Sequence, residues 1–220
     1  MTIERLEGRR KATARRPPRE AAVLEAELTP RVRTMLDSLT GEVETLRRDL
    51  QAARDRLELA ERVADQDQLL PVLNRRAFVR ELARHIGLAA RYGTPASLLY
   101  FDLDGFKRIN DAYGHAGGDA VLANFARILC GQVRDSDVVG RLGGDEFGII
   151  LAHANEAQAH RKASALMDAL SATPAEWNGM RLAVSFSFGA FELSSSENAE
   201  TAIMRADDAM YAQKRGRAAR

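Results

Sequence analysis

The fold of this chain is decided by Arg141-Leu142-Gly143-Gly144-Asp145-Glu146-Phe147-Gly148-Ile149-Ile150. Apolar residues on both sides of Gly143-Gly144 predict two strands, with the glycines at the bend of a hairpin. Glycine permits positive φ at such a bend and leaves backbone N–H groups open to an anion. Because the carboxylates of Asp145 and Glu146 follow directly, the hairpin is a candidate site for a metal ion and a phosphate. For Gly-Gly-Asp alone, a solvated turn is the alternative.

A second pair of carboxylates lies upstream, where the apolar run from Ser97 to Phe101 leads into Asp102 and Asp104. A carboxylate at the end of a strand is held rigidly beside the neighbouring strand. If this strand pairs with the hairpin, Asp102 and Asp145 converge on one hard cation with oxygen ligands, as Mg²⁺ requires. Two acidic sites on neighbouring strands therefore favour a metal centre over two solvated turns.

The remaining apolar segments predict a central sheet with helices on its faces. The expected helices cover residues 76–91, 120–130, 157–170 and 199–214, and the expected strands cover residues 97–101, 138–140, 147–151 and 182–191. Asn198 is the expected N-cap of the last helix. From residue 97 to residue 191 the order is βαββαβ, which is ferredoxin-like. The predicted class is therefore α/β (α+β), with a long helix before the domain.

Five motifs occur in order between residues 67 and 217. They are Asp67 with Asn74-Arg75-Arg76-x-Phe78; Asp102-Leu103-Asp104-x-Phe106-Lys107-x-Ile109-Asn110-Asp111-x-Tyr113-Gly114-His115-x-x-Gly118-Asp119-x-x-Leu122; Arg141-x-Gly143-Gly144-Asp145-Glu146-Phe147; Ser187-Phe188-Gly189; and Ala206-Asp207-x-Ala209-Met210-Tyr211-x-x-Lys214. In this combination residues 67–217 resemble the GGDEF family of diguanylate cyclases. The resemblance implies a fold similar to the palm of polymerases and to nucleotidyl cyclases.

The family joins two GTP molecules into cyclic di-GMP with loss of pyrophosphate, and the resemblance assigns roles to the acidic residues. Asp102, Asp145 and the Leu103 carbonyl are the implied ligands of Mg²⁺, with Mn²⁺ as the alternative ion. Glu146 is implied as a further active-site carboxylate, and Lys107 as a cation near the α-phosphate. Phosphoryl transfer depends mainly on alignment and on neutralised charge, which these residue types supply.

Substrate recognition is implied at two places. Asn110 and Asp119 are the expected guanine-binding pair, because an amide and a carboxylate match the base edge and adenine would leave them unpaired. Helix capping is the alternative for both residues, and Asp119 stands at the head of an expected helix. Gly143 and Gly144 are expected to approach the phosphates.

Lys214 is expected to bind polyphosphate as well, since the apolar face of its helix packs on the core and leaves the lysine free. The family continues Lys-x-x-Gly-Arg, whereas this chain reads Lys214-Arg215-Gly216-Arg217, which is one residue shorter. The role of Arg217 is therefore left open, with Arg215 as a competitor. Complementing the helix dipole is the alternative for all three basic residues.

Arg134 and Asp137 form an Arg-x-x-Asp pattern just before the hairpin. By resemblance this is a product-inhibition site, in which the arginine grips a guanine edge and a phosphate of cyclic di-GMP and the aspartate contacts the base. The alternative is a surface ion pair. The pattern thus predicts feedback regulation of the cyclase.

The segment before the domain has the period of a coiled coil. Apolar residues alternate in spacings of four and three at Val32, Leu36, Leu39, Val43, Leu46, Leu50, Ala53, Leu57, Ala60 and Ala64. Oppositely charged pairs flank this seam and favour two parallel strands: Glu42 with Arg47, Asp49 with Arg54, and Arg56 with Glu61. Residues 21–66 are therefore expected to join two chains in a homodimer, so that their two GTP-loaded sites face each other. An unidentified regulatory protein could bind this coiled coil. An amphipathic helix folded back on its own domain is the alternative.

The link between helix and domain departs from the family pattern. Pro71 replaces a glycine, so the helix is expected to end near Leu69. Asp67 and Arg75 are expected to pair across this turn and to orient the helix on the domain.

Composition bounds the remaining possibilities. The chain has 220 residues, a net charge of +1 and a single cysteine, Cys130, which excludes an internal disulfide and is expected in the core. No apolar run approaches the roughly 20 residues of a transmembrane helix, which predicts a cytoplasmic protein. Residues 1–20 are basic and are expected to be a disordered tail, while the overall charge gives no pull toward DNA. The alternative function is that of a catalytically silent receptor, which would bind GTP or cyclic di-GMP and signal through the coiled coil.

Overall fold

The computed structural model describes residues 29–194 and 196–218. The expected basic tail and residues 21–28 of the expected coiled coil lie outside this range. Contacts divide the chain into two units, Met1–Leu59 and Ala60–Arg220. Within the described residues, no helix is long and apolar enough to cross a membrane.

The segment before the domain is one helix, α2 (Pro30–Asp65), of 36 residues. The seam residues Leu39, Val43 and Leu46 are between 45 and 65 % exposed, so this apolar stripe is largely uncovered within the chain. The expected helix end near Leu69 is wrong by four residues. The Asn74 side chain donates to the carbonyl of Ala64 at 2.7 Å and thereby satisfies a group at the helix end, and the chain then turns.

The domain is built on a four-stranded antiparallel sheet in the order β2-β3-β1-β6. Its strands are β1 (Ala96–Asp104), β2 (Val138–Arg141), β3 (Glu146–Ala152) and β6 (Ser185–Glu192). The predicted ferredoxin-like βαββαβ order is confirmed. Each expected strand of this sheet is present, with its ends extended or shortened by a few residues.

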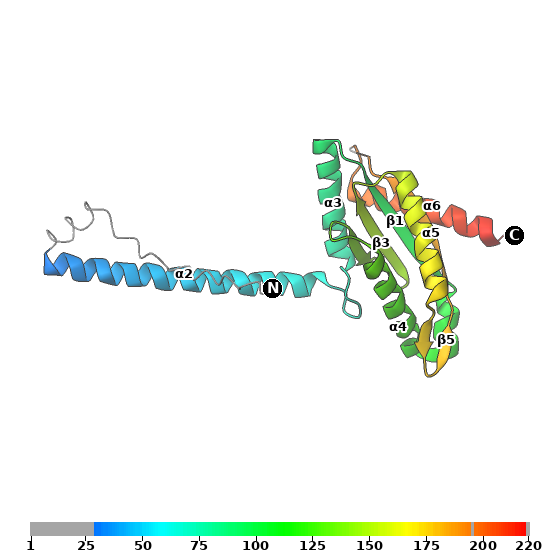
Figure 1. Cartoon of the computed structure of the whole chain (residues 1–220), viewed down its shortest axis with the longest axis horizontal. Helices are drawn as coiled ribbons and strands as arrows, with labels where there is room; N and C mark the ends of the chain where they lie inside the picture. Colours follow the sequence, from blue (N-terminus) through cyan, green and yellow to red (C-terminus); the bar gives the residue numbers. More distant parts are fainter. Residues whose placement is uncertain (1–28, 195, 219–220) are drawn as a thin grey trace, which may run out of the picture. The chain divides into compact units, whose positions relative to one another are not determined.

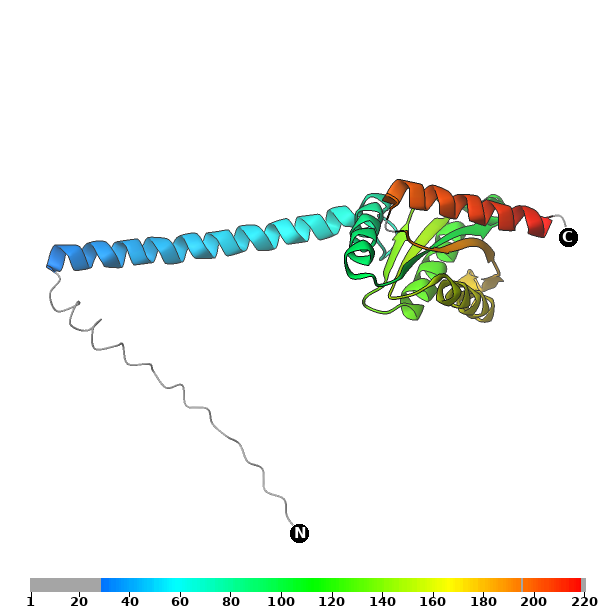
Figure 2. The ribbon, with the colours of Figure 1, turned by 90° about the horizontal axis from the view of Figure 1, so that it is seen from above.

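Two helices cover each face of the sheet (Figures 1 and 2). The helices α3 (Arg75–Tyr92) and α6 (Ala199–Ala218) pack on one face, and α4 (Phe106–Gln132) and α5 (Glu156–Ala172) pack on the other. On the second face Phe125 makes an edge-to-face contact with Phe147, with ring centroids 5.0 Å apart, and Phe101 packs likewise on Phe186 at 5.1 Å. These fully buried rings form the centre of the larger core.

Helix α4 differs most from expectation, because it starts at Phe106 and not at residue 120. Its two halves meet at Gly114, whose φ of 73° and ψ of 173° interrupt the helix. Asp119 therefore lies inside the helix, and the expectation that it caps a helix start is wrong. Cys130 is exposed near the other end of α4, so its expected place in the core is wrong too.

A small hairpin was not expected from the sequence. Its strands are β4 (Ala175–Trp177) and β5 (Met180–Leu182), joined by Asn178-Gly179. Both turn residues have positive φ, 48° and 76°, as a tight hairpin turn requires. The Asn-Gly pair was the available signal, but the strands are too short to give an apolar pattern.

The hairpin formed by β2 and β3 packs against Phe78 of α3. Gly140 and Gly148 are register partners, and a Cβ added to either would lie within 2.6 Å of the Phe78 side chain. Two opposed glycines thus let an aromatic ring approach the backbone of both strands. This packing fixes the hairpin against the helix that follows the interdomain link.

Candidate active site

Pairing of β1 with β3 brings the two acidic sites together. Asp102 lies opposite Glu146 in the strand register, and the backbone N–H of Leu103 donates to the carbonyl of Asp145 at 3.2 Å. Directly opposed residues of antiparallel strands share one face, so Asp102 and Glu146 point to the side covered by α3 and α6. The negative charge of Asp102 also acts on the Asp145 carboxyl, so the two acids lie near one another.

Like charges at this site affect the ionisation of Asp145. Burial raises the pKa of the Asp145 carboxyl, and the neighbouring negative charge of Asp102 raises it further. A cation placed between the two acids would relieve this repulsion. The two acids offer only carboxylate oxygens, the ligand type that suits Mg²⁺ or Mn²⁺.

The acidic site is small. Among the residues in the described ranges, no group of three or more histidine, cysteine or acidic side chains is arranged to hold a metal ion. Two carboxylates and a backbone carbonyl leave several positions for oxygens from elsewhere. A triphosphate is a natural source of these ligands, because Mg²⁺ is usually shared between one or two carboxylates and substrate phosphates.

Lys214 reaches this site from α6. Its Nζ lies 2.5 Å from Oδ1 of Asp102, so the expectation of a free lysine is wrong for this state of the protein. Burial opposes the charge of Lys214, but the bond to Asp102 and the nearby Asp104 and Asp145 raise its pKa. The ammonium group thus neutralises part of the acidic site. The Arg217 side chain lies outside the described residues, so the choice between Arg217 and Arg215 stays a prediction.

The glycine turn is held by Arg141. Its guanidinium donates to the carbonyls of Gly143 at 3.1 Å and Gly144 at 2.7 Å, and to Asp67 at 3.2 Å. Side-chain room is lacking at Gly143, where an added Cβ would lie against the carboxylate of Glu146. A side chain at this position would displace the carboxylate of Glu146.

The expected pair of Asp67 with Arg75 is wrong. Asp67 pairs with Arg141, and Arg75 donates to the carbonyl of Leu142 at 3.2 Å instead. Asp67 also accepts from the N–H groups of Leu69 and Leu70, which orients its carboxylate toward the hairpin. Both arginines hold the turn, a role that sequence reasoning missed because these partners lie about 70 residues apart.

The implied guanine-binding residues, Asn110 and Asp119, lie on either side of the interruption of α4 at Gly114. Oδ1 of Asn110 lies so close to Gly118 that a Cβ there would be 1.9 Å away, and Asp119 follows Gly118. The Asp119 side chain is exposed, as is Lys107 on the first turn of the helix. Asn110 therefore packs against the residue that directly precedes Asp119.

Asp104 has a role that sequence reasoning did not assign. Its two carboxylate oxygens accept from the hydroxyls of Ser185 and Ser187, each at 2.8 Å. These bonds tie the end of β1 to β6, and Ser187 is buried. Asp104 therefore fixes the strand end that carries Asp102. Alternating Asp-x-Asp and Ser-x-Ser on two strands was the signal available in the sequence.

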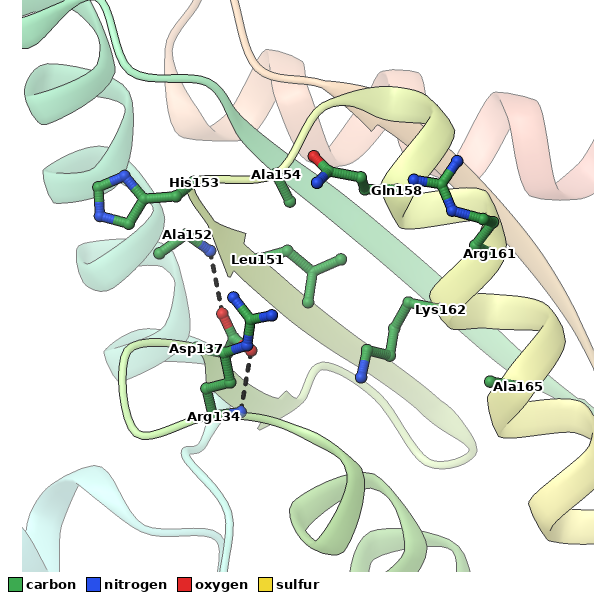
Figure 3. A pocket seen from close by; sticks show the side chains of 10 residues that line it. All are labelled: Arg134, Asp137, Leu151, Ala152, His153, Ala154, Gln158, Arg161, Lys162 and Ala165. Atoms are coloured by element: carbon green, nitrogen blue, oxygen red, sulfur yellow. Dashed lines mark hydrogen bonds between the residues drawn. The ribbon is translucent and has the colours of Figure 1, made fainter.

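Arg134 and Asp137 line a separate cavity of about 320 Å³ between the end of α4, β3 and α5 (Figure 3). Asp137 accepts from the backbone N–H of Arg134 at 3.0 Å and of Ala152 at 3.1 Å. Asp137 thus bonds to the backbone of Arg134, in place of the alternative surface ion pair. Arg161 and Lys162 of α5 line the same cavity, so cationic side chains outnumber the single acid there.

The domain has a mixed α/β fold, with the acidic residues at the paired ends of β1 and β3. The family described as "Diguanylate cyclase, GGDEF domain" matches residues 64–220, and the chain belongs to this family.

Named relatives agree with this assignment. The chain is 39 % identical over 162 residues to diguanylate cyclase DosC of Escherichia coli K12, which covers 73 % of the chain and 35 % of DosC. It is 32 % identical over 197 residues to diguanylate cyclase DgcP of Pseudomonas aeruginosa, which covers 90 % of the chain and 29 % of DgcP. The chain thus spans about a third of the length of these curated relatives.

Two solved structures resemble the chain beyond the domain alone. The coiled coil and GGDEF domain of DgcB from Caulobacter crescentus, in complex with c-di-GMP, matches with a TM-score of 0.72 and 28 % identity over 81 % of this chain and 95 % of that one. Diguanylate cyclase SiaD of Pseudomonas aeruginosa, in complex with its activator SiaC, matches with a TM-score of 0.74 and 28 % identity over 90 % of this chain and 76 % of that one.

Asp145→Asn should stabilise the metal-free protein at neutral pH. The raised pKa means that the folded protein holds the Asp145 proton more tightly than the unfolded chain, so stability falls as pH rises above the ordinary value of 3.8 and through the folded-state pKa. The amide removes this penalty. We expect a higher thermal unfolding midpoint for the variant at pH 7 and a vanishing difference near pH 4.

Asp168→Asn serves as the control, because Asp168 is an exposed acid on α5. It should leave the midpoint unchanged at every pH. An Asp145→Asn effect that is independent of pH would contradict the electrostatic explanation.

Proposed function

We propose that this chain is a diguanylate cyclase that condenses two GTP into cyclic di-GMP and two pyrophosphates. The observation that carries the proposal is the meeting of Asp102 and Asp145 at the end of the β1–β3 pair. In the reaction each 3′-oxygen bonds to the α-phosphorus of the other GTP, the bond to the β-phosphate breaks, and each 3′-hydroxyl loses its proton. Relatives named as diguanylate cyclases support the choice of product.

Asp102, Asp145 and the Leu103 carbonyl would hold Mg²⁺, with Mn²⁺ as the alternative. When bound, the ion supplies charge neutralisation for the triphosphate and lowers the pKa of the attacking hydroxyl. Glu146 stands on the same face and limits the space beside Gly143. Its negative charge adds to the attraction of the site for cations.

The two lysines would act on the phosphates. Lys214 neutralises Asp102 in the free protein, and its ammonium becomes available to the triphosphate once a divalent ion takes over that charge. Lys107 lies exposed at the start of α4, two residues beyond the turn at Gly105, and would add positive charge at the α-phosphate. Gly143 and Gly144 admit the phosphate chain close to the backbone.

Guanine selection would fall to Asn110 and Asp119. Packing of Asn110 on Gly118 sets the distance between these two groups. The carboxylate of Asp119 can accept from the N1–H and the C2 amino group of guanine, and adenine has neither of these two donors. Unpaired polar groups would then disfavour ATP.

Incubation of the purified protein with GTP and Mg²⁺, followed by separation of the nucleotides, tests the proposal. We expect cyclic di-GMP and pyrophosphate, with loss of at least about 100-fold in rate for Asp145→Asn or Asp102→Asn. Chelation of the metal should stop the reaction, and Mg²⁺ or Mn²⁺ should restore it. Asp168→Asn should retain the full rate.

Two other results would decide against the proposal. Binding of GTP without turnover would indicate the alternative, a silent receptor. Product formation that survives Asp145→Asn would rule out the assigned metal site.

We further propose that cyclic di-GMP inhibits the enzyme through the cavity at Arg134 and Asp137. The free guanidinium end of Arg134 and the basic side chains of α5 suit the two phosphates of the product. Asp137 is already bonded to two backbone N–H groups, so its main contribution would be to fix the loop that presents Arg134. A relative of known structure binds c-di-GMP.

Arg134→Ala should weaken product inhibition by about tenfold or more, since a bidentate arginine contact is worth roughly 1–3 kcal/mol. Initial rates at rising concentrations of added cyclic di-GMP measure this, and the uninhibited rate should stay within about twofold. Asp135→Ala, at the exposed neighbouring position, should behave like the unaltered protein. Equal sensitivity of Arg134→Ala and the unaltered protein would refute the site.

We also propose that the seam of α2 joins two chains in a parallel coiled coil. One site binds one GTP, so the product requires two sites held face to face. The exposed apolar residues along the seam need a partner, and a coiled-coil tether gives an effective concentration on the order of millimolar. A regulatory protein that grips this helix could then set the activity.

Leu46→Lys should dissociate the dimer and lower the specific activity, which should recover partly as protein concentration rises. Sedimentation velocity and rates at nanomolar and micromolar protein measure both effects. Leu59→Lys is the matched control, because Leu59 is similarly exposed (63 % against 65 %) but lies off the seam. A fully active monomer would overturn the proposal.

A further inference from the structure

The small hairpin β4–β5 carries the only tryptophan of the chain, Trp177. It lies beside α4 at one end of the domain (Figure 1). The side-chain amide of Asn124 on α4 donates to the carbonyl of Thr173 at 2.8 Å and anchors the segment that leads into the hairpin. The hairpin is therefore fixed to the helix that carries the proposed guanine-binding residues.

Trp177 contacts α4 at a glycine. A Cβ added to Gly117 would lie 3.6 Å from Cδ1 and 3.7 Å from Nε1 of the indole, and only 2.6 Å from Cβ of Tyr113. Gly117 is buried between the two aromatic residues. These are ordinary van der Waals distances for an added Cβ, so the indole lies beside the backbone of α4 at Gly117.

This contact is one residue away from the proposed base site. Gly118 follows Gly117 and carries the side chain of Asn110 on its open face, and Asp119 comes next. The helix is interrupted at Gly114, a few residues before, so its own hydrogen bonds do not run continuously through this region. Packing from outside is therefore needed to fix the backbone between Asn110 and Asp119.

We propose that Trp177 is a positioning residue for guanine recognition, acting through Gly117 on the spacing of Asn110 and Asp119. This inference rests on the proposed function of that pair. A large rigid ring suits the role, because it buries much area and loses little conformational freedom. The hairpin then contributes to base selectivity although it contacts neither the metal site nor the phosphates.

Equilibrium binding of 3′-deoxy-GTP and 3′-deoxy-ATP to the full chain tests the inference, since neither analogue has the attacking hydroxyl. Trp177→Ala should weaken 3′-deoxy-GTP by about tenfold and leave the weaker binding of 3′-deoxy-ATP, which depends on the phosphates, unchanged. Trp177→Phe should restore most of the affinity. Met180→Ala is the matched control, because Met180 is the register partner of Trp177 and is exposed.

The possible failures are distinguishable. If Asp119→Ala loses the preference for 3′-deoxy-GTP and Trp177→Ala keeps it, Trp177 has no positioning role and the proposed function stands. Equal weakening of both analogues by Trp177→Ala would indicate general loss of structure and would also overturn the inference. If the unaltered protein does not prefer the guanine analogue, the proposed function fails and the inference with it.

Discussion

The antiparallel pairing of β1 with β3 is the constraint on which the rest of the domain depends. Its register sets Asp102 opposite Glu146 on one face and buries Phe101 and Phe147 on the other. A slip of β3 by one residue would turn Glu146 toward the aromatic core and Phe147 away from it, so apolar burial enforces the geometry of the acidic site. The same alternation that makes the core thus places Asp102, a proposed metal ligand, and Glu146 on the opposite face.

The acidic site brings together carboxylates that repel one another. Burial and Asp102 raise the pKa of Asp145, and Lys214 offsets part of the repulsion by bonding to Asp102. Repulsion between these charges lowers the stability of the folded domain, and a bound divalent ion would reduce that repulsion. Such a cost is typical of functional carboxylate pairs. Because Lys214 belongs to α6, the charge balance also links the last helix to the ends of β1 and β3.

The glycine turn is connected to the entry of the domain by a short chain of polar contacts. Arg141 bonds to both turn carbonyls and to Asp67, just after the end of α2. Asp65, the last residue of that helix, pairs with Arg80 of α3. Movement at the helix end would therefore displace the turn through these contacts, which gives a physical route for the regulation proposed to act through α2.

The sequence by itself determined the ferredoxin-like order, the acidic ends of two neighbouring strands and the apolar seam of α2. Each of these features follows from the local periodicity and spacing of residues along the chain. It missed the start of α4, since the glycines that break helical pattern there are packing sites for Asn110 and Trp177. Tertiary structure alone decided that Asp67 bonds to Arg141, that Lys214 bonds to Asp102 and that Asp104 ties β1 to β6. These pairs lie far apart along the chain, and which of several acids a given cation meets depends on how the elements pack.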